Sequence, residues 1–311
     1  MEQGHGARGG ILSRACNQPA PARWPRCNCT GTYAALDRGA EKTQPLKHGQ
    51  RVTLMHSSFR SLRIWLVIIS LIVIWLPLLI AIRIFDWDPA RYRTGLWFRR
   101  LGRAMTRANP AWRIRISGEA VQDPRHPYVV VSNHQSLADI PVISNLPWEM
   151  KWVAKEELFK LPYVGWMMRL AGDIPVDRKD PRSGARMLLA ADKYLKQKCS
   201  VMFFPEGTRS MDGRVGRFND GAFYLAITAR VPILPLAVEG SIVCIPKKDW
   251  KFGPGSDVLL KVLPPVSTSD LTTHDTEQLR DTVRAMIVRQ IADWRGVDAG
   301  TVDALARTTS K

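Results

Sequence analysis

The sequence has few of the residues that build disulfide frameworks and metal sites. Five cysteines are spread over 311 residues, and none of them forms a C-x-x-C pair. The six histidines are scattered, with no H-E-x-x-H motif and no cluster with cysteine. Because zinc sites need such spacing, we expect no protein metal site. We expect Cys199 and Cys244 to be ordinary buried thiols in a reducing compartment.

Acidic side chains are also few. The chain has 28 Asp and Glu against 45 Lys and Arg, which gives a formal net charge of +17. Such a surplus predicts an acidic partner: nucleic acid, anionic lipid, a phosphorylated substrate or an acidic carrier protein. No run of like charge reaches five residues, and the sequence has no helix-turn-helix, RNA-recognition or zinc-finger spacing. We therefore expect no nucleic-acid partner.

Residues 1–54 lack the apolar periodicity of the rest of the chain. They are rich in Gly, Pro, Arg and Cys, and their 8 Lys and Arg against 3 Asp and Glu supply +5 of the charge. Their apolar stretches are too short for a signal peptide. We expect this segment to be disordered. Met55 lies just before the first structured pattern, so a native start at Met55, with residues 1–54 outside the native protein, is a hypothesis.

A long uncharged apolar run follows, Ile64–Ile82, of 19 residues. As a helix it would be roughly 28 Å long, close to the hydrocarbon core of about 30 Å. This predicts a membrane helix. The alternatives are a buried core helix and, because Pro77 can kink the helix, a re-entrant or half-buried one.

The flanks of this run predict how the chain meets the membrane. Arginines gather close to it, at positions 60, 63, 83, 91, 93, 99, 100, 103 and 107. This bias places the body of the protein on the cytoplasmic face, in bacteria that of the inner membrane. Residues 88–108 alternate Arg with apolar residues, which predicts an amphipathic helix on an anionic surface. Alternatively, this helix packs on the domain with its Arg face in water. Residues 55–110 would then form the membrane anchor and interfacial helix.

From residue 111 the pattern alternates between strands and helices. The expected strands are Trp112–Ile116, Tyr128–Ser132, Lys151–Ala154, Asp173–Val176, Val201–Phe204, Ile233–Val238 and Val258–Val262. The expected helices lie near 157–170, 183–197, 219–229 and 275–294. This alternation predicts an α/β fold with a mixed, largely parallel sheet covered by helices. The catalytic domain would span 111–270, followed by a C-terminal helix and tail over 271–311.

One polar segment directly follows a predicted buried strand. Residues 133–139 read NHQSLAD, which places His134 in the loop and Asp139 in the first turn of the next helix. A carboxylate there can hold one imidazole nitrogen and leave the other to take a proton. Such a pair lacks a serine nucleophile and suits a substrate that brings its own hydroxyl. Alternatively, Ser136 and Asp139 form a capping box and His134 is a loop histidine.

A second segment, Phe203–Ser210, also follows an apolar strand. Gly207 lets a ligand approach the backbone, and Thr208 and Arg209 supply donors suited to a phosphate. Glu206 is expected to steady Arg209 or hold a substrate hydroxyl. The alternative is a strand-end turn with a surface ion pair. Arg178, at the end of another predicted strand, is a second candidate phosphate contact or simply an exposed arginine.

Four motifs occur in one order: N-H-x-x-x-x-D at 133–139, G-x-x-P-x-x-R at 172–178, F-P-E-G-T-R-S at 204–210 and V-P-I-x-P at 231–235. Together they resemble the glycerolipid acyltransferase family, most closely the 1-acylglycerol-3-phosphate acyltransferases, over roughly residues 60–265. The resemblance implies that His134 is the general base and Asp139 its partner. It places Arg178, Glu206, Gly207, Thr208 and Arg209 at the acceptor, with Lys155 nearby. Pro175 departs from the family pattern, which often has an apolar residue there.

The resemblance implies acyl transfer from acyl-CoA or acyl-carrier protein to the sn-2 hydroxyl of 1-acylglycerol-3-phosphate, giving phosphatidic acid. No cofactor is then needed beyond the acyl donor, and the partners are membrane lipids, that donor and the lysophospholipid. Other acceptors remain open: glycerol-3-phosphate, another lysophospholipid or a lyso-aminolipid. A non-enzymatic lipid-binding protein is a further alternative. The lack of a G-x-S-x-G motif disfavours a serine hydrolase.

Overall fold

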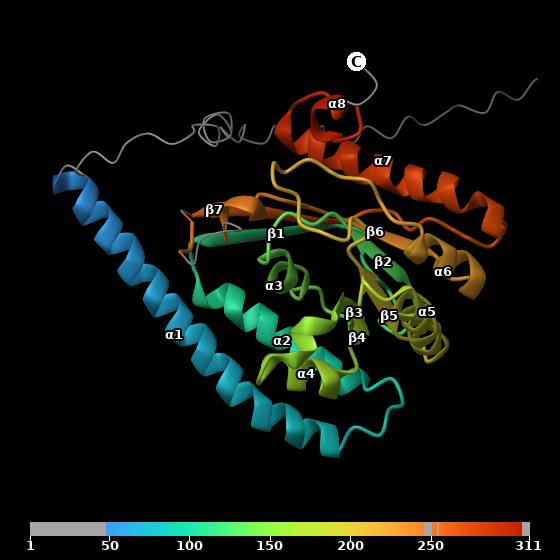
Figure 1. The fold of residues 1–311 in the computed structure, drawn as a ribbon, viewed down its shortest axis with the longest axis horizontal. Helices are drawn as coiled ribbons and strands as arrows, with labels where there is room; N and C mark the ends of the chain where they lie inside the picture. Colours follow the sequence, from blue (N-terminus) through green and yellow to red (C-terminus); the bar gives the residue numbers. More distant parts are fainter. Residues whose placement is uncertain (1–47, 246–250, 254, 307–311) are drawn as a thin grey trace, which may run out of the picture.

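Two helices precede the sheet. In the computed structural model, which describes residues 48–245, 251–253 and 255–306, α1 spans His48–Ile84 and α2 spans Tyr92–Ala108 (Figure 1). The expectation of disorder falls mostly on residues 1–47, which lie outside the described residues. Residues 48–54 belong to α1. No proline occurs between His48 and Leu76, so the helix extends upstream at the low cost of adding single residues to an existing helix.

Helix α1 packs along the body of the protein on one side only. Ile64, Ile68 and Leu79 are buried against that body. The other side exposes large apolar side chains, at Phe59, Leu62, Leu66, Val67, Ile69, Val73, Ile74, Leu78, Ile80 and Ile84. Within the described part of the chain, Ser58–Ile84 is the one segment long and apolar enough to cross a membrane, with a mean hydropathy of 2.9. Only 11% of the 18-residue apolar stretch in this segment is buried, so the alternative of a buried core helix is wrong.

Seven strands form one sheet in the order β1-β7-β6-β2-β5-β3-β4. All neighbours are parallel except β6 and β7. The strands are β1 Trp112–Gly118, β2 Val129–Ser132, β3 Met150–Lys155, β4 Ile174–Val176, β5 Ser200–Phe203, β6 Ile233–Glu239 and β7 Ser256–Val262. Each predicted strand is present, with its ends within two residues of the expected ones. The predicted mixed, largely parallel sheet is therefore confirmed.

Helices cover both faces of this sheet. The remaining helices are α3 Asp139–Ile143, α4 Val164–Ala171, α5 Pro181–Lys196, α6 Gly221–Ala229, α7 Thr276–Arg295 and α8 Ala299–Val302, with short 3-10 turns at η3 Glu156–Lys160, η4 Ser241–Val243 and η5 Thr273–Asp275. Successive side chains of β2 point to opposite faces. Val129 and Val131 accordingly pack with α5, α6 and α7, whereas Val130 packs with α1 and α3 (Figure 1).

The helix expected near 157–170 is instead two short helices, η3 and α4. Pro162 lies between them, and its missing N–H cannot continue a helix. The helix expected to begin at Asp139 is α3, but its extent was not predicted, because five residues give too short a periodic pattern to detect. Both differences fall in the segments that follow strands β2 and β3.

A buried cluster of charges attaches α2 to the sheet. Arg99 of α2 forms ion pairs with Glu149 and Asp173, and Lys151 of β3 forms one with Glu149 at 3.0 Å. Asp173 also accepts a hydrogen bond from the backbone N–H of Trp152 at 3.0 Å. Each charge therefore has a partner of opposite sign in the low-dielectric interior, where an unpaired charge would be strongly destabilising. The cluster fixes α2 relative to the strands that carry the candidate site.

The two cysteines among the described residues, Cys199 and Cys244, are free and buried. Burial raises the pKa of each thiol to about 12. Such thiols stay protonated and unreactive at neutral pH, which confirms that they are ordinary buried thiols.

Candidate active site

The candidate residues lie at one edge of the sheet, where four parallel strands end. Strands β2 and β5 are neighbours in the sheet, and β3 and β4 lie beyond β5. Because parallel strands end at the same edge, the segments after them meet there. The backbone N–H of Ser210, after β5, donates to the carbonyl of His134, after β2, at 2.8 Å. The sheet thus brings two motifs together that are about 70 residues apart in sequence.

The structure places His134 and Asp139 in direct contact. Nδ1 of His134 lies 2.7 Å from Oδ2 of Asp139, which begins α3 as expected. The Asp139 side chain is fully buried, and 13% of the His134 side chain is exposed. With Nδ1 against the carboxylate, Nε2 is the nitrogen left to exchange a proton with a bound molecule.

The capping alternative is also partly correct. Oδ2 of Asp139 accepts the backbone N–H groups of Gln135 at 2.7 Å and Ser136 at 2.9 Å. The hydroxyl of Ser136 donates to the carbonyl of Ile245 and does not bond to the backbone of Asp139. Of the two hydrogen bonds of the predicted capping box, the one from the Ser136 N–H to Asp139 is therefore formed. These bonds fix the carboxylate at the start of α3. The Asp139 carboxylate therefore both caps the loop and orients the imidazole of His134.

A phenyl ring fixes the imidazole from another side. Phe204 stacks on His134 with 4.0 Å between ring centroids and an angle of 17° between the planes. Trp152 of β3 packs in turn on Phe204, at 5.8 Å. The ring of His134 thus has a defined plane as well as a defined hydrogen bond, and both limit its motion.

Both oxygens of Glu206 accept backbone hydrogen bonds. Oε1 accepts the N–H of His134 at 2.8 Å, and Oε2 accepts the N–H of Gly216 at 3.0 Å. Burial raises the pKa of Glu206 to about 7, against the smaller lowering effect of these two bonds. This carboxylate therefore links the loop of His134 to the loop of Gly216, and its expected roles, to steady Arg209 or to hold a substrate hydroxyl, stay predictions.

The other predicted residues lie around this centre. Gly207 has φ +72°, and the Cζ of Arg178 lies 4.0 Å from where a Cβ on residue 207 would be. The end of β4 and the turn after β5 therefore meet. Thr208 is exposed and Arg209 is half-buried, both in the same turn. Lys155 ends β3 at this edge but forms an exposed ion pair with Glu157 at 2.9 Å.

Several supporting residues were not predicted. The side chain of Asn133 forms two hydrogen bonds with the backbone of Val238 in β6, at 2.8 and 2.9 Å. Arg284 of α7 donates to the carbonyls of Val215 and Gly216, both at 2.7 Å. Asn133 could have been found, since it directly precedes His134 in the motif. Arg284 lies about 70 residues from the loop it holds, and no sequence signal connects them.

The chain is similar to known acyltransferases by family model, by sequence and by structure. The family model described as Acyltransferase matches residues 113–239. A 1-acyl-sn-glycerol-3-phosphate acyltransferase alpha of Homo sapiens is 39% identical over 192 residues, which is 59% of this chain and 67% of that protein. A chloroplastic 1-acyl-sn-glycerol-3-phosphate acyltransferase of Arabidopsis thaliana is 41% identical over 133 residues, which is 42% of this chain and 37% of that protein.

A solved structure shares the fold. The crystal structure of the 1-acyl-sn-glycerophosphate acyltransferase from Thermotoga maritima matches with a TM-score of 0.66 and 29% identity, over 77% of this chain and 96% of that one. The chain spans only 37% to 61% of the length of the first three curated relatives. The residues that match the family model include His134, Asp139 and Glu206. The chain belongs to the acyltransferase family, and its relatives within that family are 1-acyl-sn-glycerol-3-phosphate acyltransferases.

Proposed function

We propose that the protein transfers an acyl chain from acyl-CoA or acyl-carrier protein to the sn-2 hydroxyl of 1-acylglycerol-3-phosphate, giving phosphatidic acid. The observation that carries the proposal is the 2.7 Å contact between Nδ1 of His134 and Asp139, with the histidine ring reachable from solvent. This arrangement supplies a base without an enzyme nucleophile, which fits an acceptor that brings its own hydroxyl.

In the proposed reaction, Nε2 of His134 takes the proton of the acceptor hydroxyl as its oxygen attacks the thioester carbonyl carbon. The tetrahedral intermediate collapses, the carbon–sulfur bond breaks, and the leaving thiolate takes the proton from the imidazolium. Asp139, buried and fixed by two backbone N–H groups, stabilises the positive imidazolium during this exchange. General-base assistance of this kind contributes about 10²–10⁴-fold.

A phosphate on the acceptor fits the charges at this edge of the sheet. Arg178 and Arg209 supply guanidinium groups, which bind phosphate oxygens in pairs. Gly207, beside Arg178, has no side chain of its own to keep a ligand from the backbone. These residues favour a phosphorylated acceptor over a neutral one. They are the reason for proposing 1-acylglycerol-3-phosphate as the acceptor.

We also propose that the protein acts at a membrane, on its cytoplasmic face. The exposed apolar side of α1 supports insertion, and the arginines around α1 and α2 support this orientation. Both ends of the apolar segment pack on the body: Ile64 belongs to one core cluster with Val130, and Leu79 to another with Leu101 and Met167. A helix held in this way favours burial of its outer face in the bilayer over a perpendicular crossing.

The test uses membranes that carry the full chain, labelled acyl-CoA or labelled acyl-carrier protein, and a panel of acceptors. The panel is 1-acylglycerol-3-phosphate, glycerol-3-phosphate, a lysophospholipid with a larger headgroup and a lyso-aminolipid. We expect labelled phosphatidic acid from the first acceptor, and less product from the others. Product from another acceptor alone would contradict the proposed substrate, and no product from any would contradict the proposed activity.

A further inference from the structure

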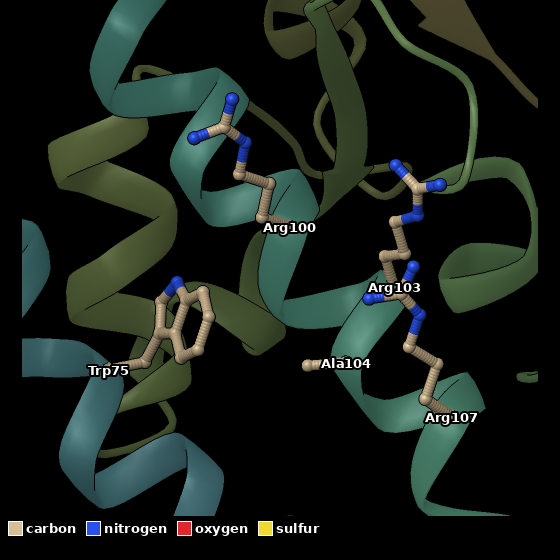
Figure 2. A pocket seen from close by; sticks show the side chains of 5 residues that line it. All are labelled: Trp75, Arg100, Arg103, Ala104 and Arg107. Atoms are coloured by element: carbon tan, nitrogen blue, oxygen red, sulfur yellow. The ribbon is translucent and has the colours of Figure 1, made fainter.

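The outer face of α2 carries a cavity that belongs to none of the catalytic loops. It is lined by Trp75, Arg100, Arg103, Ala104 and Arg107, and has a volume of about 390 Å³ (Figure 2). We call it the arginine pocket. The three arginine side chains extend the same way from α2, and Trp75 of α1 lies across from Ala104. The pocket therefore lies between the two helices that precede the sheet.

Helix geometry explains why these side chains lie on one side of α2. At 100° per residue, positions 100, 103, 104 and 107 occupy one arc of the helix surface. The adjoining arcs are occupied by other contacts: Arg99 pairs with buried acids, Gly102 approaches Ser144 of the loop after α3, and Leu101 packs against α1 and α4. The pocket arc is the side of α2 that the body does not cover.

The charge of the pocket is not neutralised by the protein. Helix α2 contains no Asp or Glu. Among the described residues, the ion pairs of α2 involve Arg99, and none involves the three pocket arginines. Arg100 instead lies over the ring of Trp97, 4.4 Å from its centroid. Three like charges on adjacent turns repel one another, so an anion between them would be bound favourably.

The surroundings indicate where such an anion comes from. Trp75 at the pocket wall adjoins Ile74 of α1, which is 63% exposed on the side that the proposed function places in the membrane, and the inference rests on that proposed location. A tryptophan at the wall is typical of the level of lipid headgroups. At roughly 30 Å³ per water, the cavity has room for a phosphate with part of its hydration shell.

We propose that the arginine pocket binds the phosphate of an anionic phospholipid of the surrounding bilayer, separately from the acceptor site at His134. Guanidinium groups of Arg103 and Arg107 bind the phosphate oxygens, since the planar fork of arginine matches them. Bound lipid holds α2 at the surface and gives the protein a preference for anionic membranes.

The experiment measures binding of the full chain to sedimented vesicles of phosphatidylcholine, alone or mixed with phosphatidylglycerol. R103Q/R107Q is compared with two variants of equal charge loss: R63Q/R93Q, on the same two helices but outside the pocket, and R230Q/R289Q, exposed at the end of α6 and on α7. R103Q/R107Q should bind the mixed vesicles at least about tenfold more weakly than either control variant, because it alone loses the charge-assisted hydrogen bonds to the lipid phosphate. The two control variants should keep most of the wild-type preference.

Two results would overturn the proposal. One is wild-type binding by R103Q/R107Q, and the other is an equal loss in R63Q/R93Q, which would show a diffuse charge effect without a pocket. R103K/R107K keeps the charge but loses the fork, so it should still bind mixed vesicles more weakly than wild type; equal binding would also overturn the proposal. Because binding is the readout, a chain that transfers no acyl group but keeps this Arg-dependent preference contradicts the proposed function and leaves the pocket supported.

Discussion

At the scale of single residues, the site depends on hydrogen bonds that cross between loops. The motif pattern correctly identified His134 and Asp139 as neighbours, because their five-residue spacing spans one turn at a strand end. It did not identify the partners of Glu206, since the bond to the His134 N–H joins residues 72 apart. That bond exists only because β2 and β5 are neighbours, and local sequence does not encode strand order.

The raised pKa of Glu206 leads to a prediction about stability and pH. Its carboxyl has an ordinary pKa of 4.5 and a pKa of about 7 in the folded protein, so the folded state binds the proton more tightly. This stability is fully present below pH 4.5 and is lost as pH rises through about 7. Relative to E206Q, whose amide does not titrate, the wild type should lose up to about 3 kcal/mol of unfolding free energy between pH 4.5 and about 7.

The measurement is the thermal unfolding midpoint of both proteins across pH in the same detergent. The midpoint of the wild type should fall relative to that of E206Q as pH rises from 4.5 to 7, and then stay parallel to it. Parallel curves over the whole range would show that Glu206 is not protonated in the folded state at these pH values.

At the scale of elements, the sequence predicted which segments form strands but not how they are ordered. Strand β2, Val129–Ser132, is buried along its whole length and was predicted, as Tyr128–Ser132, from its apolar stretch. The order β1-β7-β6-β2-β5-β3-β4 depends on contacts between distant segments. The buried cluster of Arg99, Glu149, Lys151 and Asp173 was missed for the same reason: isolated charged residues in a sequence are normally exposed.

At Gly95, the backbone of α2 lies close to Glu149 of this cluster. A Cβ there would lie 1.9 Å from Oε1 of Glu149, so G95A should displace a buried, paired carboxylate. We expect a loss of about 3–5 kcal/mol of stability, as for breaking a buried ion pair. The matched control is G184A in α5, where a Cβ meets nothing within 4 Å.

G184A should stabilise the protein by about 0.5–1 kcal/mol, since alanine is the better helix former. Thermal unfolding of the two variants should therefore move in opposite directions. A G95A protein that melts with the wild type would contradict the tight attachment of α2.

At the scale of the whole molecule, one surface combines apolar and basic side chains. Replacing Leu66 and Ile74, which are 58% and 63% exposed on α1, by lysine should release the protein from membranes. Each side chain contributes about 1.5–3 kcal/mol when fully buried in an apolar phase, so the double variant should partition at least tenfold less. L189K, at a residue 73% exposed on α5, is the control and should bind as wild type does.

Flotation with liposomes measures this partition. Equal flotation of the L66K/I74K and L189K variants would contradict insertion through α1. The sequence predicted the membrane segment from its uncharged length, but not that one side of α1 packs on the body, because contacts with α2 and α4 are made only in the folded chain.

The central claim is that His134 acts as the base in acyl transfer. It is tested most directly by the rate at which H134A transfers a labelled acyl group from acyl-CoA to 1-acylglycerol-3-phosphate, compared with wild type at equal protein in the same membranes. The structure predicts a loss of about 10²–10⁴-fold, with unchanged vesicle binding and unfolding midpoint. Turnover near the wild-type rate in H134A would contradict it.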